Sequence, residues 1–213
     1  MIPAVRWLKF NEIKARAERV LEKFHASREL PIPVDDIVDV GLGIDIFPLP
    51  GLRVSFDFDA FLSNDLMRIC VDEYVYTHYE NRYRFTLAHE IGHLCLHDYV
   101  YKACPITCVD DFHRFNEALD AEQKRKMEWQ ANRFAGYLLA PDSHVISCWD
   151  RCRPALRAMT AEAKEHGFRP EEYRDMLVET AGERMCPDFE VSAESMKFRL
   201  FTALDDHVLS LPP

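Results

Sequence analysis

A mostly apolar segment in the middle of the chain, residues 84–97, carries the pattern His-Glu-x-x-His at positions 89–93. Its apolar residues recur at intervals of three and four, which predicts a helix. On a helix, His89 and His93 lie on one face, one turn apart. Burying two imidazoles and the Glu90 carboxylate without partners would cost several kcal/mol, and a metal ion held by the histidines removes that cost. The pattern therefore predicts a buried helix that holds a metal ion.

Glu90 occupies a different position from the two histidines. Because it follows His89 by one residue, it is displaced around the helix and need not be a ligand, yet it stays close enough to contact a water held by the metal. A base beside such a water is typical of hydrolytic sites. Imidazole and carboxylate ligands favour zinc, and a catalytic zinc site has three protein ligands and one open position. A third ligand must therefore come from elsewhere in the chain.

A second long helix, predicted over residues 117–139, offers that third ligand at Glu128. Ala131 and Ala135 would lie on the same side of this helix, where small side chains let two helices approach closely. Asn132, one turn after Glu128, could hydrogen-bond to a histidine or on the Glu90 side of the site, behind the metal ligands. Spacing alone leaves a second interpretation open, in which Glu128 is one of several acids on a solvated face.

The acidic charge of the chain makes some partners unfavourable. Its 213 residues carry 26 Lys and Arg against 36 Asp and Glu, and the formal net charge of −10 disfavours direct binding to nucleic acid or anionic lipid. No stretch approaches the roughly 20 apolar residues of a membrane span, and the N-terminus does not read as a signal peptide. We therefore expect a cytoplasmic protein without direct nucleic-acid or membrane contacts, in an oligomeric state that the sequence leaves open.

Seven cysteines, an odd number without an export signal, predict reduced thiols rather than a disulfide framework. Two pairs share the spacing Cys-x-x-x-Cys, namely Cys104 with Cys108 and Cys148 with Cys152. Together they could make a second zinc site of four thiolates, although structural zinc sites usually take their cysteines from tighter turns. We favour ordinary thiols, and a second metal site stays an alternative.

The remaining pattern predicts an α+β fold in one domain. A small, mostly antiparallel sheet packed on the motif helix is predicted by apolar or alternating runs at residues 44–47, 54–58 and 66–71. We expect the domain to span residues 1–213, with an N-terminal helix (1–30), a core (31–141), a helical C-terminal part (142–205) and a tail (206–213).

Breaks in the pattern predict where the helices stop. A polar connection is expected over residues 98–116, between the motif helix and the helix that carries Glu128. The C-terminal part is expected to be helical, with breaks near Pro154, residues 167–170 and Pro187.

The two motifs in this order resemble the ImmA/IrrE family of zinc metallopeptidases. The resemblance rests on residues 84–94, on Glu-x-x-Ala-Asn-x-Phe-Ala at 128–135 and on Leu-Leu-Ala-Pro at 138–141. Weaker similarity upstream and downstream extends it to roughly residues 30–203. Two features depart from the family pattern: Ala140 stands where the family usually has methionine, and the stretch from Cys104 to Cys108 is not a family feature.

The resemblance implies a zincin-like helix and a gluzincin-like site, in which His89, His93 and Glu128 hold one Zn²⁺ per chain and Glu90 is the catalytic base. It also implies a metallopeptidase whose substrate is a helix-turn-helix transcriptional repressor, because family members commonly cleave or otherwise inactivate such a protein. The alternative is a zinc-containing binding protein, an anti-repressor or a toxin–antitoxin component, that acts without cleavage. A structural zinc site is closed by four protein ligands, so Glu90 beside an open position distinguishes the two.

Hydrolysis also needs a hydrogen-bond donor for the oxyanion. The sequence offers five candidates without choosing among them: Tyr76, His97, Tyr99, His113 and Tyr137. His97 is interpreted as a histidine at the end of the motif helix that faces solvent rather than as a ligand. The strand at 66–71 could hold an extended substrate along its edge. The segment 191–200 resembles part of a helix-turn-helix, and we expect it to pack rather than to contact DNA.

Overall fold

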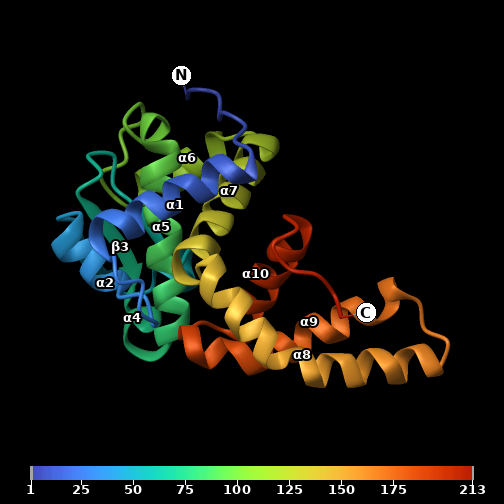
Figure 1. Ribbon diagram of the computed structural model, residues 1–213. Coiled ribbons are helices and arrows are strands. Elements are labelled where there is room, and N and C mark those ends of the chain that lie inside the picture. Colours follow the sequence, from blue (N-terminus) through green and yellow to red (C-terminus); the bar gives the residue numbers. More distant parts are fainter. Residues whose placement is uncertain (1, 213) are drawn as a thin grey trace.

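A three-stranded sheet lies at one side of the molecule, and helices pack against it and against one another (Figure 1). The computed structural model describes residues 2–212. The strands are β1 (Asp45–Leu49), β2 (Ala60–Leu62) and β3 (Arg68–Asp72). The helices are α1 (Phe10–Phe24), α2 (Val34–Asp36), the π-helical turn η1 (Ile37–Gly41), α3 (Leu52–Phe56), α4 (Glu73–His78), α5 (Glu80–Tyr101), α6 (Val109–Ala118), α7 (Ala121–Leu139), α8 (Asp142–Glu165), α9 (Pro170–Phe189) and α10 (Ala193–Asp205).

The sheet has the order β1-β3-β2, with β3 in the centre. β3 runs parallel to β1, where Phe47 lies opposite Cys70, and antiparallel to β2, where Phe61 lies opposite the same cysteine. The α+β class is therefore confirmed, but the sheet is mixed rather than mostly antiparallel. After β1 the chain passes through the helix α3 instead of a hairpin and forms β2 away from β1. The next strand, β3, then inserts between β1 and β2.

Residues 54–58, predicted as a strand, belong instead to α3 and the turn after it. Gly51 precedes the helix with a φ of 74°, and Asp57 ends it with a φ of 60°. Leu52 is buried, whereas Val54 is 92% exposed, so only one side of this segment packs inward. The apolar alternation reflects one helical turn rather than the two faces of a strand.

Two expectations about helix ends are wrong. The connection over residues 98–116 includes most of α6, and Pro154 and Pro187 lie inside α8 and α9 rather than at breaks. A proline removes one backbone hydrogen bond from a helix. Both helices continue because apolar side chains before and after each proline are buried in the core, which offsets that loss.

The helices pack in two groups along the chain. α1 lies across α7 and also touches α5, with its buried stripe of Ile13, Ala17, Val20 and Leu21 facing inward. α8 and α9 form an antiparallel pair that extends away from the sheet, and α10 joins this pair to α7 (Figure 1). One continuous cluster of buried apolar side chains runs through both groups. Among the described residues, no helix combines the length and apolar character that a membrane crossing requires.

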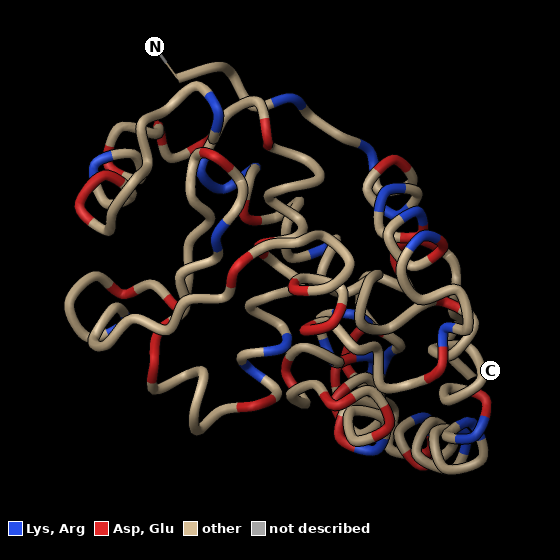
Figure 2. The backbone as a smooth tube through the Cα atoms, turned by 90° about the vertical axis from the view of Figure 1, so that its left-hand side faces the viewer, with Lys and Arg blue, Asp and Glu red and all other residues tan. Residues whose placement is uncertain are grey.

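Charged residues are distributed over the whole molecule. Figure 2 shows Lys and Arg interspersed with Asp and Glu along most elements. The net charge of −10 is thus spread over many elements.

The packing of α5 on α7 depends on Gly92, inside the His-Glu-x-x-His pattern. A Cβ atom at this position would lie 3.1 Å from Ala131 Cα and 3.2 Å from Ala131 O on α7. These distances are shorter than ordinary carbon contacts, so the two helices approach this closely because position 92 has no side chain. The same close approach brings Glu128, one turn before Asn132, towards α5.

We expect Gly92→Ala to destabilise the protein by about 1–3 kcal/mol, because the added methyl group must push α7 away. Zinc binding should weaken as well, since α7 carries Glu128. Urea unfolding and zinc titration measure the two effects. Gly182→Ala in α9 is the matched control, because a Cβ there would meet its nearest atom at 3.4 Å. Unchanged stability and zinc affinity in Gly92→Ala would contradict the prediction.

Candidate metal centre

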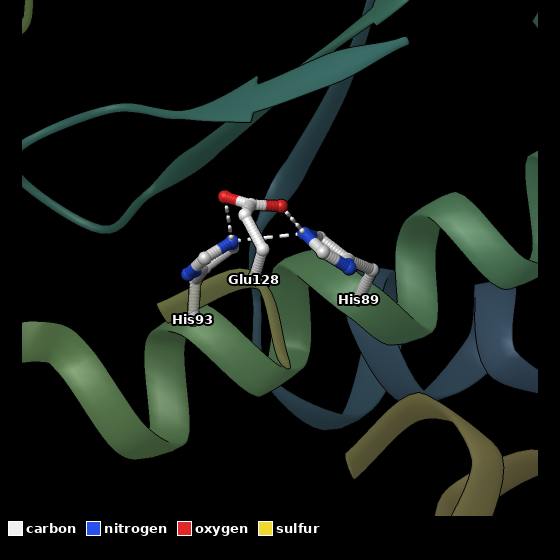
Figure 3. Close-up of side chains that lie close together, drawn as sticks. All are labelled: His89, His93 and Glu128. Atoms are coloured by element: carbon white, nitrogen blue, oxygen red, sulfur yellow. Dashed lines mark hydrogen bonds and ion pairs between the residues drawn. The ribbon is translucent and has the colours of Figure 1, made fainter. Parts of the chain in front are cut away.

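Three donor side chains from two helices meet at one point (Figure 3). α5 presents His89 and His93, one turn apart, and α7 presents Glu128 opposite them. The Nε2 atoms of the two histidines are 2.9 Å apart. Glu128 Oε2 lies 3.3 Å from His89 Nε2, and Glu128 Oε1 lies 3.7 Å from His93 Nε2. The fold thus places side by side the three residues that the sequence suggests as ligands.

This donor set fits a transition-metal ion. The three ligand atoms lie within 4.8 Å of one another, and no other group of three or more His, Cys, Asp or Glu side chains within residues 2–212 does so. Two imidazoles and a carboxylate are ligands of catalytic zinc sites, which keep a fourth position open. The Glu128 side chain is 46% exposed, so the cluster is accessible from its side. The three residues can therefore hold a metal ion and still admit a water or a substrate.

Hydrogen bonds behind the two histidines orient their rings. Asn132 Oδ1 lies 2.9 Å from His89 Nδ1. On the second ligand, His93 Nδ1 lies 3.1 Å from His97 Nδ1. The sequence suggested that His97 faces solvent, and this is wrong: His97 is fully buried, at a kink where its backbone leaves helical geometry before α5 runs on to Tyr101. Both contacts leave the Nε2 atoms of His89 and His93 directed towards Glu128.

Glu90 lies beside the cluster but is not one of its three donors. Its side chain lines the same cleft and is 4% exposed. Within the described part of the protein, its buried Oε2 has no hydrogen-bond partner. Burial raises the pKa of Glu90 to about 7, against the opposing charge of His89. A carboxyl group that titrates near neutrality can accept a proton and return it at pH 7.

His89 and Glu128 form an ion pair when no metal is bound. Burial alone would lower the pKa of His89, but the hydrogen bond to Glu128 and the charges of Glu128 and Glu90 raise it to about 9. Burial and the charge of His89 hold the pKa of His93 well below its usual range. At neutral pH the His89 ring is therefore protonated and positively charged, whereas the His93 ring is neutral.

We expect zinc binding to release the His89 proton, because a metal ligand must be deprotonated. Since the pKa of His89 is raised to about 9, the apparent zinc affinity should rise with pH below 9, by about tenfold per pH unit. Competition with a chelating dye at pH 6, 7 and 8 measures the slope. An ordinary histidine would titrate near pH 6.5, so an affinity that is flat between pH 7 and 8 would contradict the raised pKa.

The cluster opens into a cleft of about 430 Å³. Five aromatic side chains line part of it, and most of the other lining residues are polar or charged: the aromatic ones are Phe56, Phe58, Phe85, Tyr101 and Phe112. The ring of Phe58 packs edge-on against the ring of Phe112, with centroids 4.9 Å apart. A cleft that combines aromatic walls with polar groups converging at one point is typical of a site that binds an organic substrate and orients one of its bonds.

Tyr101 is a cleft residue that the sequence analysis missed. None of the five oxyanion donors named above lines the cleft; for example, Tyr99 bonds to Arg6 N and Tyr137 to Asp206. The ring of Tyr101 lies 5.6 Å from the ring of His93. Burial holds the pKa of Tyr101 well above its usual range, so its hydroxyl group stays protonated and can donate. In the sequence, the only feature that could have indicated Tyr101 was a motif helix long enough to include it.

Two other expectations concern the strand at 66–71 and the cysteines. The strand expected at 66–71 forms β3, which is paired on both sides and cannot take a substrate along an edge. All seven cysteines are free thiols, and neither Cys-x-x-x-Cys pair belongs to a donor cluster within residues 2–212.

Comparison with known proteins places this geometry in a family. No curated protein matches the chain. A family match covers 160 of its 213 residues, from 42 to 201, and contains the whole cluster together with Glu90. The matched family is described as the IrrE N-terminal-like domain (Peptidase_M78). The chain therefore belongs to the ImmA/IrrE family of metallopeptidase-like proteins, as the resemblance of its two motifs predicts.

Proposed function

We propose that this protein is a zinc-dependent endopeptidase that hydrolyses a peptide bond in a protein substrate. The Glu90 carboxyl group carries the proposal, because it is buried, has an unpaired oxygen and lies beside the three donors. An unpaired buried carboxylate lowers stability, and a proton acceptor for an attacking water accounts for its presence. A structural clamp would close the fourth position with a protein ligand and would gain nothing from Glu90.

The residues around the cluster divide the chemistry among them. His89, His93 and Glu128 would hold the ion, and zinc bound there lowers the pKa of a water and polarises a peptide carbonyl. Glu90 accepts a proton from the attacking water and later donates one to the amine that leaves. Tyr101 can donate a hydrogen bond to the oxyanion from the cleft wall.

Strand β2 supports binding of an extended peptide. It is an edge strand of the sheet and packs against α5. Backbone hydrogen bonds join residues 59 and 63 to β3. In an antiparallel pair such bonds alternate, so Ala60 and Leu62 direct their N–H and C=O groups away from β3. The Leu62 N–H hydrogen-bonds to Glu90, and the two groups of Ala60 and the Leu62 carbonyl remain for the open edge. A substrate segment can pair with these remaining groups and lie across the cleft.

Within this proposal, the substrate is a helix-turn-helix repressor and the reaction takes place in the cytoplasm. Family membership supports the first point, because proteins that these motifs resemble commonly cleave or inactivate such repressors. Seven free cysteines support the second, since reduced thiols suit a reducing compartment.

The test is to incubate the zinc-loaded protein with a panel of helix-turn-helix repressors from the same organism and with unfolded casein. We expect new peptide termini, detected by mass spectrometry, that disappear with a chelator and return with zinc. Full zinc occupancy without any new terminus would refute the peptidase. If a repressor is then bound uncut, the binding-protein alternative takes its place.

A further inference from the structure

The N-terminal segment, defined as residues 4–9, lies outside the family match and yet reaches the metal centre. Two glutamines of α7 hold it: Val5 N–H donates to Gln123 Oε1, and Gln130 Nε2 donates to Arg6 O, each at 2.9 Å. Trp7 stacks on Trp129 of the same helix, with ring centroids 5.0 Å apart. The segment is therefore bound to the helix that supplies Glu128.

A chain of hydrogen bonds leads from this segment to a metal ligand. Gln130 Oε1 lies 3.1 Å from His97 Nε2, and His97 Nδ1 lies 3.1 Å from His93 Nδ1. Gln130 and His97 are both 0% exposed, and His93 is 3% exposed. Water therefore has little access to this chain, and its members must satisfy one another.

The direction of every bond in the chain follows from the Arg6 carbonyl, which can only accept. Gln130 must turn its NH₂ group to that carbonyl, so its Oε1 faces His97 and must accept. His97 then donates from Nε2, and its Nδ1 has a free lone pair. His93 must donate to that lone pair from its own Nδ1, which leaves His93 Nε2 without a proton.

The contact between the two ligands agrees with this direction. The Nε2 atoms of His89 and His93 are 2.9 Å apart, so one donates and the other accepts. Glu128 Oε2 lies 3.3 Å from His89 Nε2, and a carboxylate can only accept, so the proton between the two rings lies on His89 Nε2. His93 Nε2 is then the acceptor, as the bond chain from Arg6 requires.

We propose that the N-terminal segment is part of the metal centre: the Arg6 carbonyl, acting through Gln130 and His97, holds His93 in the tautomer whose Nε2 lone pair faces the metal position. Gln130 and His97 are positioning residues for His93. This inference rests on the metal site of the proposed function, but not on peptide cleavage. It extends the site to a segment that precedes the family domain and that sequence motifs do not mark.

The first test reads the tautomer directly in the unaltered, metal-free protein. Long-range ¹H–¹⁵N NMR spectra of the histidine rings at pH 7.5 should show the proton of His93 on Nδ1 and that of His97 on Nε2. A proton on His93 Nε2 would overturn the proposal. This measurement needs no variant and no metal.

The second test compares two identical substitutions on α7, with zinc alone as the probe. Gln130→Leu removes the acceptor for His97, and we expect its zinc Kd to rise about 10–100-fold. Gln123→Leu removes a different hydrogen bond of the segment, the one from Val5 N–H, without touching His97, and its zinc Kd should stay within about threefold. Equal zinc Kd values for Gln130→Leu and the unaltered protein, with both folded by circular dichroism, would overturn the proposal.

A third variant separates the tautomer from simple packing. Gln130→Glu keeps the volume of the side chain but cannot donate to the Arg6 carbonyl, where two acceptors would then face each other, and we expect its zinc Kd to rise as in Gln130→Leu. A zinc Kd close to that of the unaltered protein would overturn the role of the Arg6 carbonyl. All three readouts are independent of turnover, so a protein that binds zinc as expected but cleaves no peptide would refute the proposed function and leave this inference standing.

Discussion

Replacing Glu90 with glutamine is expected to lower kcat/KM for peptide hydrolysis by about 10²–10⁴-fold, the range for loss of a general base. The amide has nearly the same volume as the carboxyl group, so a side chain that is 4% exposed keeps its packing. It cannot accept a proton from water. Zinc should stay bound, because His89, His93 and Glu128 are unchanged.

The stability of Glu90→Gln provides a second readout with a defined sign. Burial raises the pKa of Glu90 from 4.5 to about 7, so folding favours its protonated form. The native protein therefore loses stability relative to its glutamine variant as the pH rises from 4.5 to 7. Metal-free Glu90→Gln should be at least as stable as the unaltered protein at pH 8, as urea unfolding measures.

The matched control is Glu122→Gln, on the exposed face of α7. This variant also replaces one carboxyl group with an amide, and we expect its kcat/KM and zinc content to be unchanged. If Glu90→Gln retains more than a tenth of the activity while binding one zinc per chain, Glu90 is not the proton acceptor.

Arg199→Met is expected to destabilise the protein by about 3–5 kcal/mol, because it breaks a buried ion pair from one side. The Arg199 side chain is 2% exposed and pairs with Asp142, and its Nε donates to Ala140 O at 3.0 Å. Its guanidinium group also lies over the ring of Tyr137, 5.0 Å from the centroid. Methionine fills the space but leaves the Asp142 carboxylate, which is 15% exposed, with less compensation.

Thermal unfolding measures this effect. For a chain of this size, the loss corresponds to a drop in Tm of roughly 6–20 °C. Lys14→Met is the matched control, because Lys14 pairs with the same carboxylate but its side chain is 34% exposed. We expect it to cost about 1 kcal/mol or less. Equal losses in the two variants would show that burial does not set the contribution of Arg199.

Local periodicity predicted the parts of this protein that depend on neighbours along the chain. The histidines at 89 and 93 share a helix face because of their spacing, whatever the rest of the fold. The stripe on α1 and the strand that became β1 follow from the same kind of pattern. Where the pattern was short, it misled: residues 54–58 alternate like a strand, yet Gly51 and Asp57 bound a helical turn there.

Local periodicity could not predict contacts between segments that are far apart in the sequence. From the sequence, several acidic residues near Glu128 were equally good candidates for the third ligand. The close approach of α7 to Gly92 is what places Glu128 beside the histidines. The strand expected at an edge lies in the centre of the sheet, because pairing depends on a connection that the sequence did not reveal.

The sequence by itself determined the chemistry that one helix can present: two imidazoles one turn apart and a carboxylate beside them. Only the tertiary structure decided which groups complete and orient that chemistry, namely Glu128, Tyr101, and the bond chain from Arg6 through Gln130 to His97. The physical reason is range. Helical spacing acts over a few residues, whereas burial and hydrogen-bond direction are set by partners that the fold brings from 33 and 124 residues away.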